Sequence, residues 1–224
     1  MAEILRLENI NYSYIDGGYE RQILKDLCFT FEESRFYTIL GPSGSGKTTL
    51  LSIISGLDTP SSGEIFFRGE NIRDITLHKY RRNAISIVFQ QYNLISYLTA
   101  MENVLLAMSE TDNRVPKDRR NVAYNLLERF GIVNSKADRM VKQLSGGEQQ
   151  RVAIARSLAS NVDLIFADEP TGNLDTATEH EIIDVFKELS HEFAKTIIVV
   201  THSDTVSAMS DQRALLKDGK LQKI

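Results

Sequence analysis

A glycine-rich segment at residues 41–48, Gly-Pro-Ser-Gly-Ser-Gly-Lys-Thr, most constrains what this chain can fold into. It matches the P-loop pattern GxxxxGK[ST], which needs a buried strand before the loop and a helix after it. The apolar run at residues 36–40 predicts that strand, and the amphipathic stretch at 47–56 predicts the helix. The glycines let backbone N–H groups curl around anionic oxygens, and the helix N-terminus adds positive charge. The sequence therefore predicts a site for the phosphates of a nucleoside triphosphate.

Within this loop, Lys47 is expected to reach the β- and γ-phosphates, and Thr48 is expected to place its hydroxyl on Mg²⁺. The nucleotide-binding residues predicted here are Gly41, Pro42, Ser43, Gly44, Ser45, Gly46, Lys47, Thr48 and Thr49.

Composition argues against several other classes of protein. The 224 residues carry 26 basic and 30 acidic side chains, and a net charge of −4 gives no electrostatic case for nucleic-acid binding. The longest apolar runs, such as residues 197–200, fall far short of the ~20 residues that span a bilayer, and the N-terminus has no signal-peptide pattern. A single cysteine, Cys28, excludes an internal disulfide and fits a reducing cytosol, and we expect it to serve packing in an alternating strand. The basic clusters at 78–82 and 117–120 are expected to be solvated helix faces, with contact to lipid headgroups or a membrane partner as the alternative.

Apolar patterning predicts strands and helices that alternate at both ends of the chain. The expected strands cover residues 4–10, 23–31, 36–40, 63–69, 85–89, 163–167 and 196–200, with a terminal hairpin at 214–222. The polar stretch 12–22 is expected to be a loop. Residues 99–158 are mainly helical, and N-terminal capping boxes are predicted at Thr99, Ser145 and Thr176, each followed by Glu three residues later. This pattern indicates an α/β fold with a mainly parallel sheet and an inserted helical lobe.

Two further motifs accompany the P-loop. Residues 144–150 read Leu-Ser-Gly-Gly-Glu-Gln-Gln, and an apolar strand ends in Asp168-Glu169. The first motif opens a helix, so its N–H groups can bind a second phosphate. The second places carboxylates at the carboxyl edge of the sheet, beside the P-loop, where Asp168 could hold Mg²⁺.

Together with Gln90, the Thr-Gly-Asn-Leu-Asp segment at 171–175 and His202, these motifs resemble the ATP-binding cassette (ABC) family of ATPases, in the family's order and spacing over nearly the whole chain. The resemblance implies one P-loop NTPase domain over 1–224, with an antiparallel β-subdomain. Its RecA-like core would cover about 1–90 and 159–224, and its helical subdomain about 91–158. It also implies ATP and Mg²⁺ as ligands.

The resemblance assigns a role to each motif residue. Asp168 holds Mg²⁺, and Glu169 is the general base that polarises the attacking water. His202 bridges the γ-phosphate and the other subunit, and Gln90 senses Mg²⁺ and the γ-phosphate. Asp175 signals across the dimer.

Three more residues, Ser145, Gly146 and Gly147, would bind the ATP of a second copy in a head-to-tail homodimer. An ordinary helix cap is the alternative for Ser145. Tyr14 is expected to stack on adenine, although Tyr12 lies two residues away and a plain surface tyrosine is the alternative.

Residues 88–104 resemble the subgroup that serves lipoprotein release, macrolide export and cell division (LolD, MacB and FtsE). The resemblance implies an ATP-hydrolysing subunit that powers export of lipoproteins, peptides or drugs through a separate membrane permease. It would be cytoplasmic, on the inner face of the cell membrane, and would act with a periplasmic or extracellular adaptor and no nucleic acid. The alternative is a non-transport ATPase, similar to FtsE, that regulates cell-wall or sensing machinery. For the docking groove of the permease, the candidates are Leu94, Tyr97, Leu98 and Met101, with the lobe core as an equal alternative.

Overall fold

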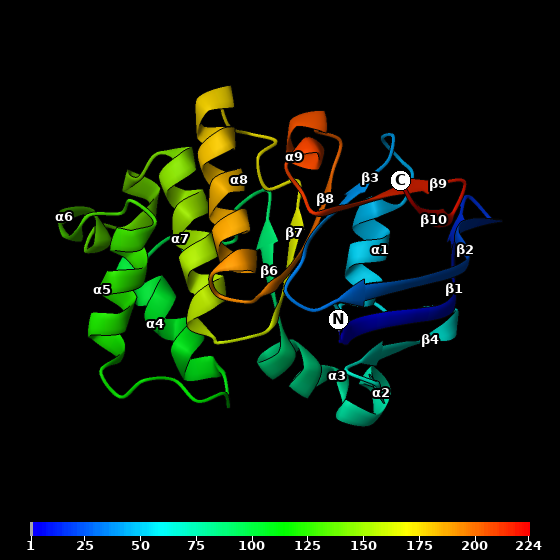
Figure 1. Cartoon of the computed structure of the whole chain (residues 1–224), viewed down its shortest axis with the longest axis horizontal. Coiled ribbons are helices and arrows are strands. Elements are labelled where there is room, and N and C mark those ends of the chain that lie inside the picture. The colour runs from blue at the N-terminus through cyan, green and yellow to red at the C-terminus, as the bar shows by residue number, and fades with distance from the viewer. Residues whose placement is uncertain (1) are drawn as a thin grey trace.

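The computed structural model describes residues 2–224 and contains two β-sheets with helices packed around them (Figure 1). The strands are β1 (Glu3–Asp16), β2 (Tyr19–Glu32), β3 (Phe36–Leu40), β4 (Ser62–Phe67), β5 (Glu70–Asn71), β6 (Ile85–Phe89), β7 (Leu164–Asp168), β8 (Thr196–Thr201), β9 (Gln212–Lys217) and β10 (Lys220–Lys223). The helices are α1 (Lys47–Ile54), α2 (Ile72–Ile75), α3 (Leu77–Lys79), α4 (Ala100–Glu110), α5 (Arg119–Arg129), α6 (Asn134–Ala137), α7 (Gly146–Ala159), α8 (Thr176–His191) and α9 (Asp204–Ala208), with a π-helical turn η1 (Tyr80–Ala84) and a 3₁₀ turn η2 (Val141–Gln143).

The larger sheet is mainly parallel, as predicted. Its strand order is β10-β9-β3-β8-β7-β6, and only β10 runs antiparallel to its neighbour. Every residue of β8 is buried, and the first four residues of both β3 and β7 are buried too. Such uninterrupted burial is typical of parallel strands that are covered on both faces. The P-loop follows β3 and the Asp168-Glu169 pair lies at the end of β7, with only β8 between these two parallel strands, so both lie at the carboxyl ends of the strands.

The smaller sheet is antiparallel, with the order β2-β1-β4-β5. Here the predicted loop at 12–22 is wrong, because β1 and β2 continue through it as a hairpin. Its turn is Gly17-Gly18, both with positive φ (59° and 84°). Polar residues dominate this stretch because most of β2 faces solvent. The prediction that Cys28 serves packing is also wrong, since this cysteine lies exposed on β2.

Helix caps follow two of the three predictions. The capping boxes of α4 at Thr99 and of α7 at Ser145 are present with both reciprocal hydrogen bonds. The predicted cap at Thr176 is wrong: α8 is capped by Asp175, whose carboxylate accepts a hydrogen bond from the backbone N–H of Thr178 (3.0 Å). A carboxylate cap at this place also suits the positive end of the helix dipole.

Alternate residues of the parallel strands feed two separate cores. Leu164 and Phe166 of β7 join α1 and the antiparallel sheet on one face. Ile165 and Ala167 point to the other face, which α8 and the helices α4 to α7 cover. Helix α1 therefore lies between the two sheets (Figure 1).

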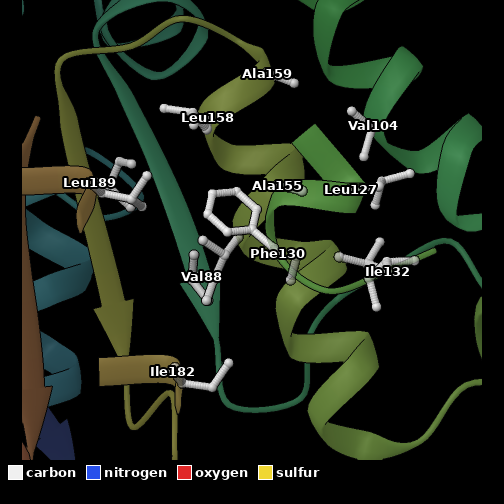
Figure 2. Close-up of a cluster of buried hydrophobic side chains, with 14 of the residues drawn as sticks. Val88, Val104, Leu127, Phe130, Ile132, Ala155, Leu158, Ala159, Ile182 and Leu189 are labelled. Carbon is white, nitrogen blue, oxygen red and sulfur yellow. The ribbon is translucent and has the colours of Figure 1, made fainter. Parts of the chain in front are cut away.

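Figure 2 shows the second core where the helices meet the sheet. Val88 of the edge strand β6 points toward Phe130, and Leu158 of α7 lies close by. All three side chains are at most 7% exposed. This packing joins the helices to the strand that leads into Gln90. Within residues 2–224, none of the helices combines the length and the apolar character needed to cross a bilayer.

Candidate active site

The P-loop has the tight geometry that its glycines require. A Cβ atom on Gly41 would lie 2.6 Å from the carbonyl oxygen of Leu216, so only glycine fits there. Gly46 has a φ of +94° and caps α1 without any side-chain hydrogen bond, which leaves the first turn open to an anion. The Lys47 ammonium is buried and donates hydrogen bonds to the carbonyls of Gly41 (2.8 Å) and Pro42 (3.2 Å). The loop residues Pro42, Ser43, Gly44 and Ser45 line a cleft of about 310 Å³.

Thr48 and Asp168 meet although 120 positions separate them. The Thr48 hydroxyl donates a hydrogen bond to Asp168 Oδ1 (3.4 Å). Burial raises the pKa of the Asp168 carboxyl, and the neighbouring charge of Glu169 adds to this. The Thr48 hydrogen bond and the charge of Lys47 act in the opposite direction. A hydroxyl and a carboxylate oxygen at this place are the kind of hard ligands that Mg²⁺ accepts.

Glu169 follows Asp168 in a left-handed backbone conformation, with φ of +44°. Its Oε1 lies 2.9 Å from His202 Nδ1. Its Oε2 accepts hydrogen bonds from the Thr201 hydroxyl (2.8 Å) and the His202 backbone N–H (3.3 Å). The Glu169 side chain is 16% exposed, whereas the His202 ring is 72% exposed. The Glu169 carboxylate is thus held by hydrogen bonds from the end of β8, and the His202 imidazole is exposed to solvent.

Gln90 follows β6 at the same edge of the sheet. Strand pairing sets Phe89 opposite Asp168, so Gln90 continues past the Asp168-Glu169 pair. Its side-chain amide donates to Asn173 Oδ1 (3.4 Å), and the Asn173 amide donates to the Gln90 carbonyl (3.4 Å). Gln90 is therefore tied to the segment that leads to Asp175.

The Ser145 segment lies elsewhere. The Ser145 hydroxyl accepts a hydrogen bond from the Glu148 N–H (3.3 Å) and caps α7. Cβ atoms on Gly146 and Gly147 would come within 2.8 Å of the Tyr92 hydroxyl and 2.6 Å of Thr178 Cγ2. In Figure 1, β6, β7 and β8 separate α7 from α1 and its P-loop.

Lys136 contacts the Glu148 carboxylate directly. This contact lowers the pKa of Glu148, because the ammonium stabilises the charged form.

The two tyrosines near the N-terminus differ in their surroundings. The Tyr12 hydroxyl donates to Asp58 Oδ2 (2.6 Å). Tyr14 is 42% exposed and lines a cleft of about 290 Å³ on the antiparallel sheet, distinct from the cleft beside the P-loop. Tyr14 is thus the more available of the two for stacking.

The fold therefore gathers Lys47, Thr48, Asp168, Glu169 and His202 at one sheet edge, with Gln90 beside them. It keeps Ser145, Gly146 and Gly147 apart.

Several residues that hold this site were not predicted. Asn173 clamps Gln90, and Thr201 holds Glu169. The Glu179 carboxylate, expected to complete a capping box, instead accepts hydrogen bonds from the hydroxyls of Thr171 (3.2 Å) and Ser203 (2.8 Å). Thr171 and Asn173 follow β7, Thr201 ends β8 and Ser203 follows it, so their place at the carboxyl ends of these strands is the signal that the sequence offers.

Comparison with known proteins is consistent with this geometry. Residues 24–172 match the model of the ABC transporter family. The chain is 39% identical to the lipoprotein-releasing system ATP-binding protein LolD 1 of Rhodopseudomonas palustris, over 99% of both chains. It is 38% identical to the macrolide export ATP-binding/permease protein MacB of Rhodopirellula baltica, covering 96% of this chain and 32% of that one.

Among solved structures, a dimer of the ATP-binding cassette MJ0796 of Methanocaldococcus jannaschii, bound to ADP and Pi, matches with a TM-score of 0.88. The match has 39% identity and covers 98% of each chain. The predicted family and fold are therefore confirmed: the chain belongs to the ABC transporter family and is an ATP-hydrolysing, ATP-binding subunit of that family.

Proposed function

We propose that this chain powers export through a separate membrane permease, and that two copies clamp ATP·Mg²⁺ between them. The observation that carries the proposal is the separation of the two phosphate-binding segments. The P-loop and Ser145 belong to different parts of one chain, and β6 to β8 lie between them. A second copy, turned head to tail, would bring its Ser145 segment to the P-loop of the first. The MJ0796 relative has been solved as a dimer.

The side chains at the sheet edge suit hydrolysis of a bound triphosphate. Lys47 would hold the β- and γ-phosphates, and Tyr14 would stack on adenine. Glu169 would accept a proton from the attacking water, and His202 would contact the γ-phosphate. A positioned base of this kind typically contributes about 10²–10⁴ in rate. Gln90 and Asp175 would report the state of the site to the helices and to the second copy.

Mg²⁺ fits the donors that are present. Within residues 2–224 no group of three or more His, Cys, Asp or Glu side chains could hold a metal by itself. Magnesium in nucleotide sites usually takes one or two protein oxygens together with substrate phosphates and water. Thr48 and Asp168 would supply the protein ligands, with Gln90 close to them. Bound there, the ion would neutralise charge on the phosphates.

We propose a cleft beside the edge strand β6 as the docking site of the permease. It has a volume of about 500 Å³ and lies between η1, β6, α4 and α7. Ile85, Ile87 and Phe89 give it an apolar side, and Arg81 and Arg156 contribute positive charge. This cleft is not lined by any of the predicted docking candidates, Leu94, Tyr97, Leu98 and Met101. Met101 is buried in the core, and Tyr97 is 74% exposed.

The relatives support a proposal for the cellular setting. The name of MacB joins an ATP-binding and a permease function, and this chain matches 32% of that protein. The chain would therefore act in the cytoplasm, bound to a permease at the inner face of the membrane. A periplasmic or extracellular adaptor would receive the motion through that permease.

Replacement of Ser145 by arginine tests the shared site. The Ser145→Arg chain should bind ATP with unchanged affinity in calorimetry, because its P-loop is intact, yet neither dimerise nor hydrolyse ATP. Ser109→Arg, an exposed serine on α4, is the matched control and should behave as wild type. Normal ATPase activity in Ser145→Arg would refute the proposal.

A further inference from the structure

The strongest unassigned feature is a ring of hydrogen bonds that contains Glu169. The Thr201 hydroxyl donates to Glu169 Oε2 (2.8 Å) and accepts from the backbone N–H of Ser203 (3.0 Å). The Ser203 hydroxyl donates to Glu179 Oε1 (2.8 Å), and the Thr171 hydroxyl donates to the same oxygen (3.2 Å). Thr171 is two residues from Glu169, so the main chain closes the ring.

Each hydroxyl of the ring has one clear direction. Thr201 and Ser203 each donate one hydrogen bond and accept another; Ser203 Oγ accepts from the Val206 N–H (3.3 Å). Glu179 only accepts, because an ionised carboxylate has no proton to give. It therefore fixes the orientation of both hydroxyls that point to it.

Burial of its hydroxyls and the backbone conformation of Glu169 indicate that loss of a hydrogen bond in the ring would be costly. Thr201 and Thr171 are 1% and 5% exposed, so a hydroxyl that lost its partner there would not find water readily. Glu169 itself has a positive φ of 44°, which a residue with a side chain keeps only when its surroundings hold it. The turn from Glu169 to Gly172 is closed by a backbone hydrogen bond (3.1 Å). Glu179, from α8, ties this turn to the segment after β8.

We propose that Glu179 is a positioning residue for ATP hydrolysis: it joins the segments after β7 and β8 and thereby holds the Glu169 carboxylate in place for the attacking water. The inference rests on the proposed role of Glu169 as the base. The Glu179 carboxylate accepts its hydrogen bonds from Thr171 and Ser203, which belong neither to the P-loop nor to the proposed Mg²⁺ ligands. Its loss should therefore change the chemical step and leave ATP binding alone.

The test compares substitutions in the full chain. Glu179→Leu keeps the size and removes the acceptor, whereas Glu179→Gln keeps a carbonyl oxygen that can accept both hydroxyls. We expect Glu179→Leu to lower kcat about 10–100-fold, as small misplacements of catalytic groups do, with an unchanged Kd for ATP. Glu179→Gln should restore most of kcat. Glu181→Leu is the control on the same helix, α8: it removes a carboxylate that pairs with Arg151 of α7 and should leave kcat unchanged.

A second comparison separates positioning from general damage. In a Glu169→Gln background, Glu179→Leu should cause no further loss, because the group that it positions is already gone. If Glu179→Leu does not fold, two substitutions of Thr201 test the same ring. Thr201→Val, which removes the hydroxyl, should lower kcat, and Thr201→Ser, which keeps it, should retain most of kcat.

Three results would overturn the inference: wild-type kcat in Glu179→Leu and in Thr201→Val, a Gln variant as slow as the Leu variant, or an equal further loss in the Glu169→Gln background. Wild-type turnover in Glu169→Gln alone would instead refute the proposed base, whatever Glu179 does.

Discussion

Lys47 shows how one side chain can serve both its own loop and a ligand. Its ammonium is 8% exposed and donates to the carbonyls of Gly41 and Pro42. An ammonium has three N–H donors, so two hydrogen bonds to the loop leave one for a phosphate oxygen. The loop carbonyls thus hold the charge at the mouth of the site before any nucleotide arrives.

We predict that Lys47→Ala lowers the affinity for ATP about 10–100-fold, because a hydrogen bond to a charged group contributes about 1.5–3 kcal/mol. Isothermal titration calorimetry measures the change. Lys217→Ala is the matched control: it removes a lysine from the same cleft and should have a much smaller effect. Unchanged affinity in Lys47→Ala would contradict the assignment of the loop.

At the scale of elements, the helix caps decide where α4, α7 and α8 begin. Thr99 and Ser145 accept hydrogen bonds from the N–H groups of Glu102 and Glu148. At α8 the predicted capping box starts at Thr176, one residue after the real cap. The cap is Asp175, whose carboxylate accepts hydrogen bonds from both the N–H and the hydroxyl of Thr178. These hydrogen bonds lower the pKa of the Asp175 carboxyl.

We predict that Asp175→Ala lowers the urea midpoint of unfolding at pH 7, whereas Thr176→Ala leaves it nearly unchanged. Thr99→Ala provides the scale, since loss of a threonine cap costs about 0.5–2 kcal/mol. A carboxyl group whose pKa is lower in the folded state stabilises the protein at pH values above its unfolded-state pKa. That stabilisation is lost as the pH falls through the folded-state pKa. The difference between wild type and Asp175→Ala should therefore shrink in acid. If Asp175→Ala and Thr176→Ala lowered the urea midpoint equally, the assignment of Asp175 as the cap of α8 would be contradicted.

The local hydrophobic pattern predicts the strands and helices that carry the chemistry. It misses the elements that are too short to show a regular hydrophobic period. The strands before the P-loop and before Asp168 are continuous apolar runs, and both were placed correctly. Helices α2 and α3 and the turn η1 are too short to show a period. The sequence predicts a loop at the Gly17-Gly18 hairpin because its strands are polar on the side that faces solvent. The division into a core (about 1–90 and 159–224) and a helical subdomain (about 91–158) stays a prediction.

Contacts between distant residues set the limit of prediction within the site. The pairing of Thr48 with Asp168 is predictable, since the sequence places Asp168 at the carboxyl edge of the sheet, beside the P-loop. The pairing of Glu179 is not, because its partners Thr171 and Ser203 lie 8 and 24 positions away and form no pattern. Only the fold shows that they share one oxygen.

For the whole molecule, the central observation is that the P-loop and the Ser145 segment, both proposed to bind phosphate, do not meet within one chain. The P-loop opens α1 between the two sheets, and the Ser145 segment opens α7 among the helices on the other side of β6 to β8. Each segment is held in place within its own chain: Lys47 hydrogen-bonds to the P-loop backbone, and Glu148 accepts a hydrogen bond from the Ser145 N–H. Under the proposed function, a complete site therefore needs a second molecule.

The most direct measurement is analytical ultracentrifugation of Glu169→Gln with and without ATP and Mg²⁺. Removing the base should leave ATP bound and uncleaved, so the shared site stays closed. We predict a single species of about 25.3 kDa without nucleotide and a species of twice that mass with ATP and Mg²⁺. The same variant carrying Ser145→Arg should remain a monomer in both conditions. If Glu169→Gln binds ATP and sediments as a monomer at every protein concentration, two copies do not share the nucleotide.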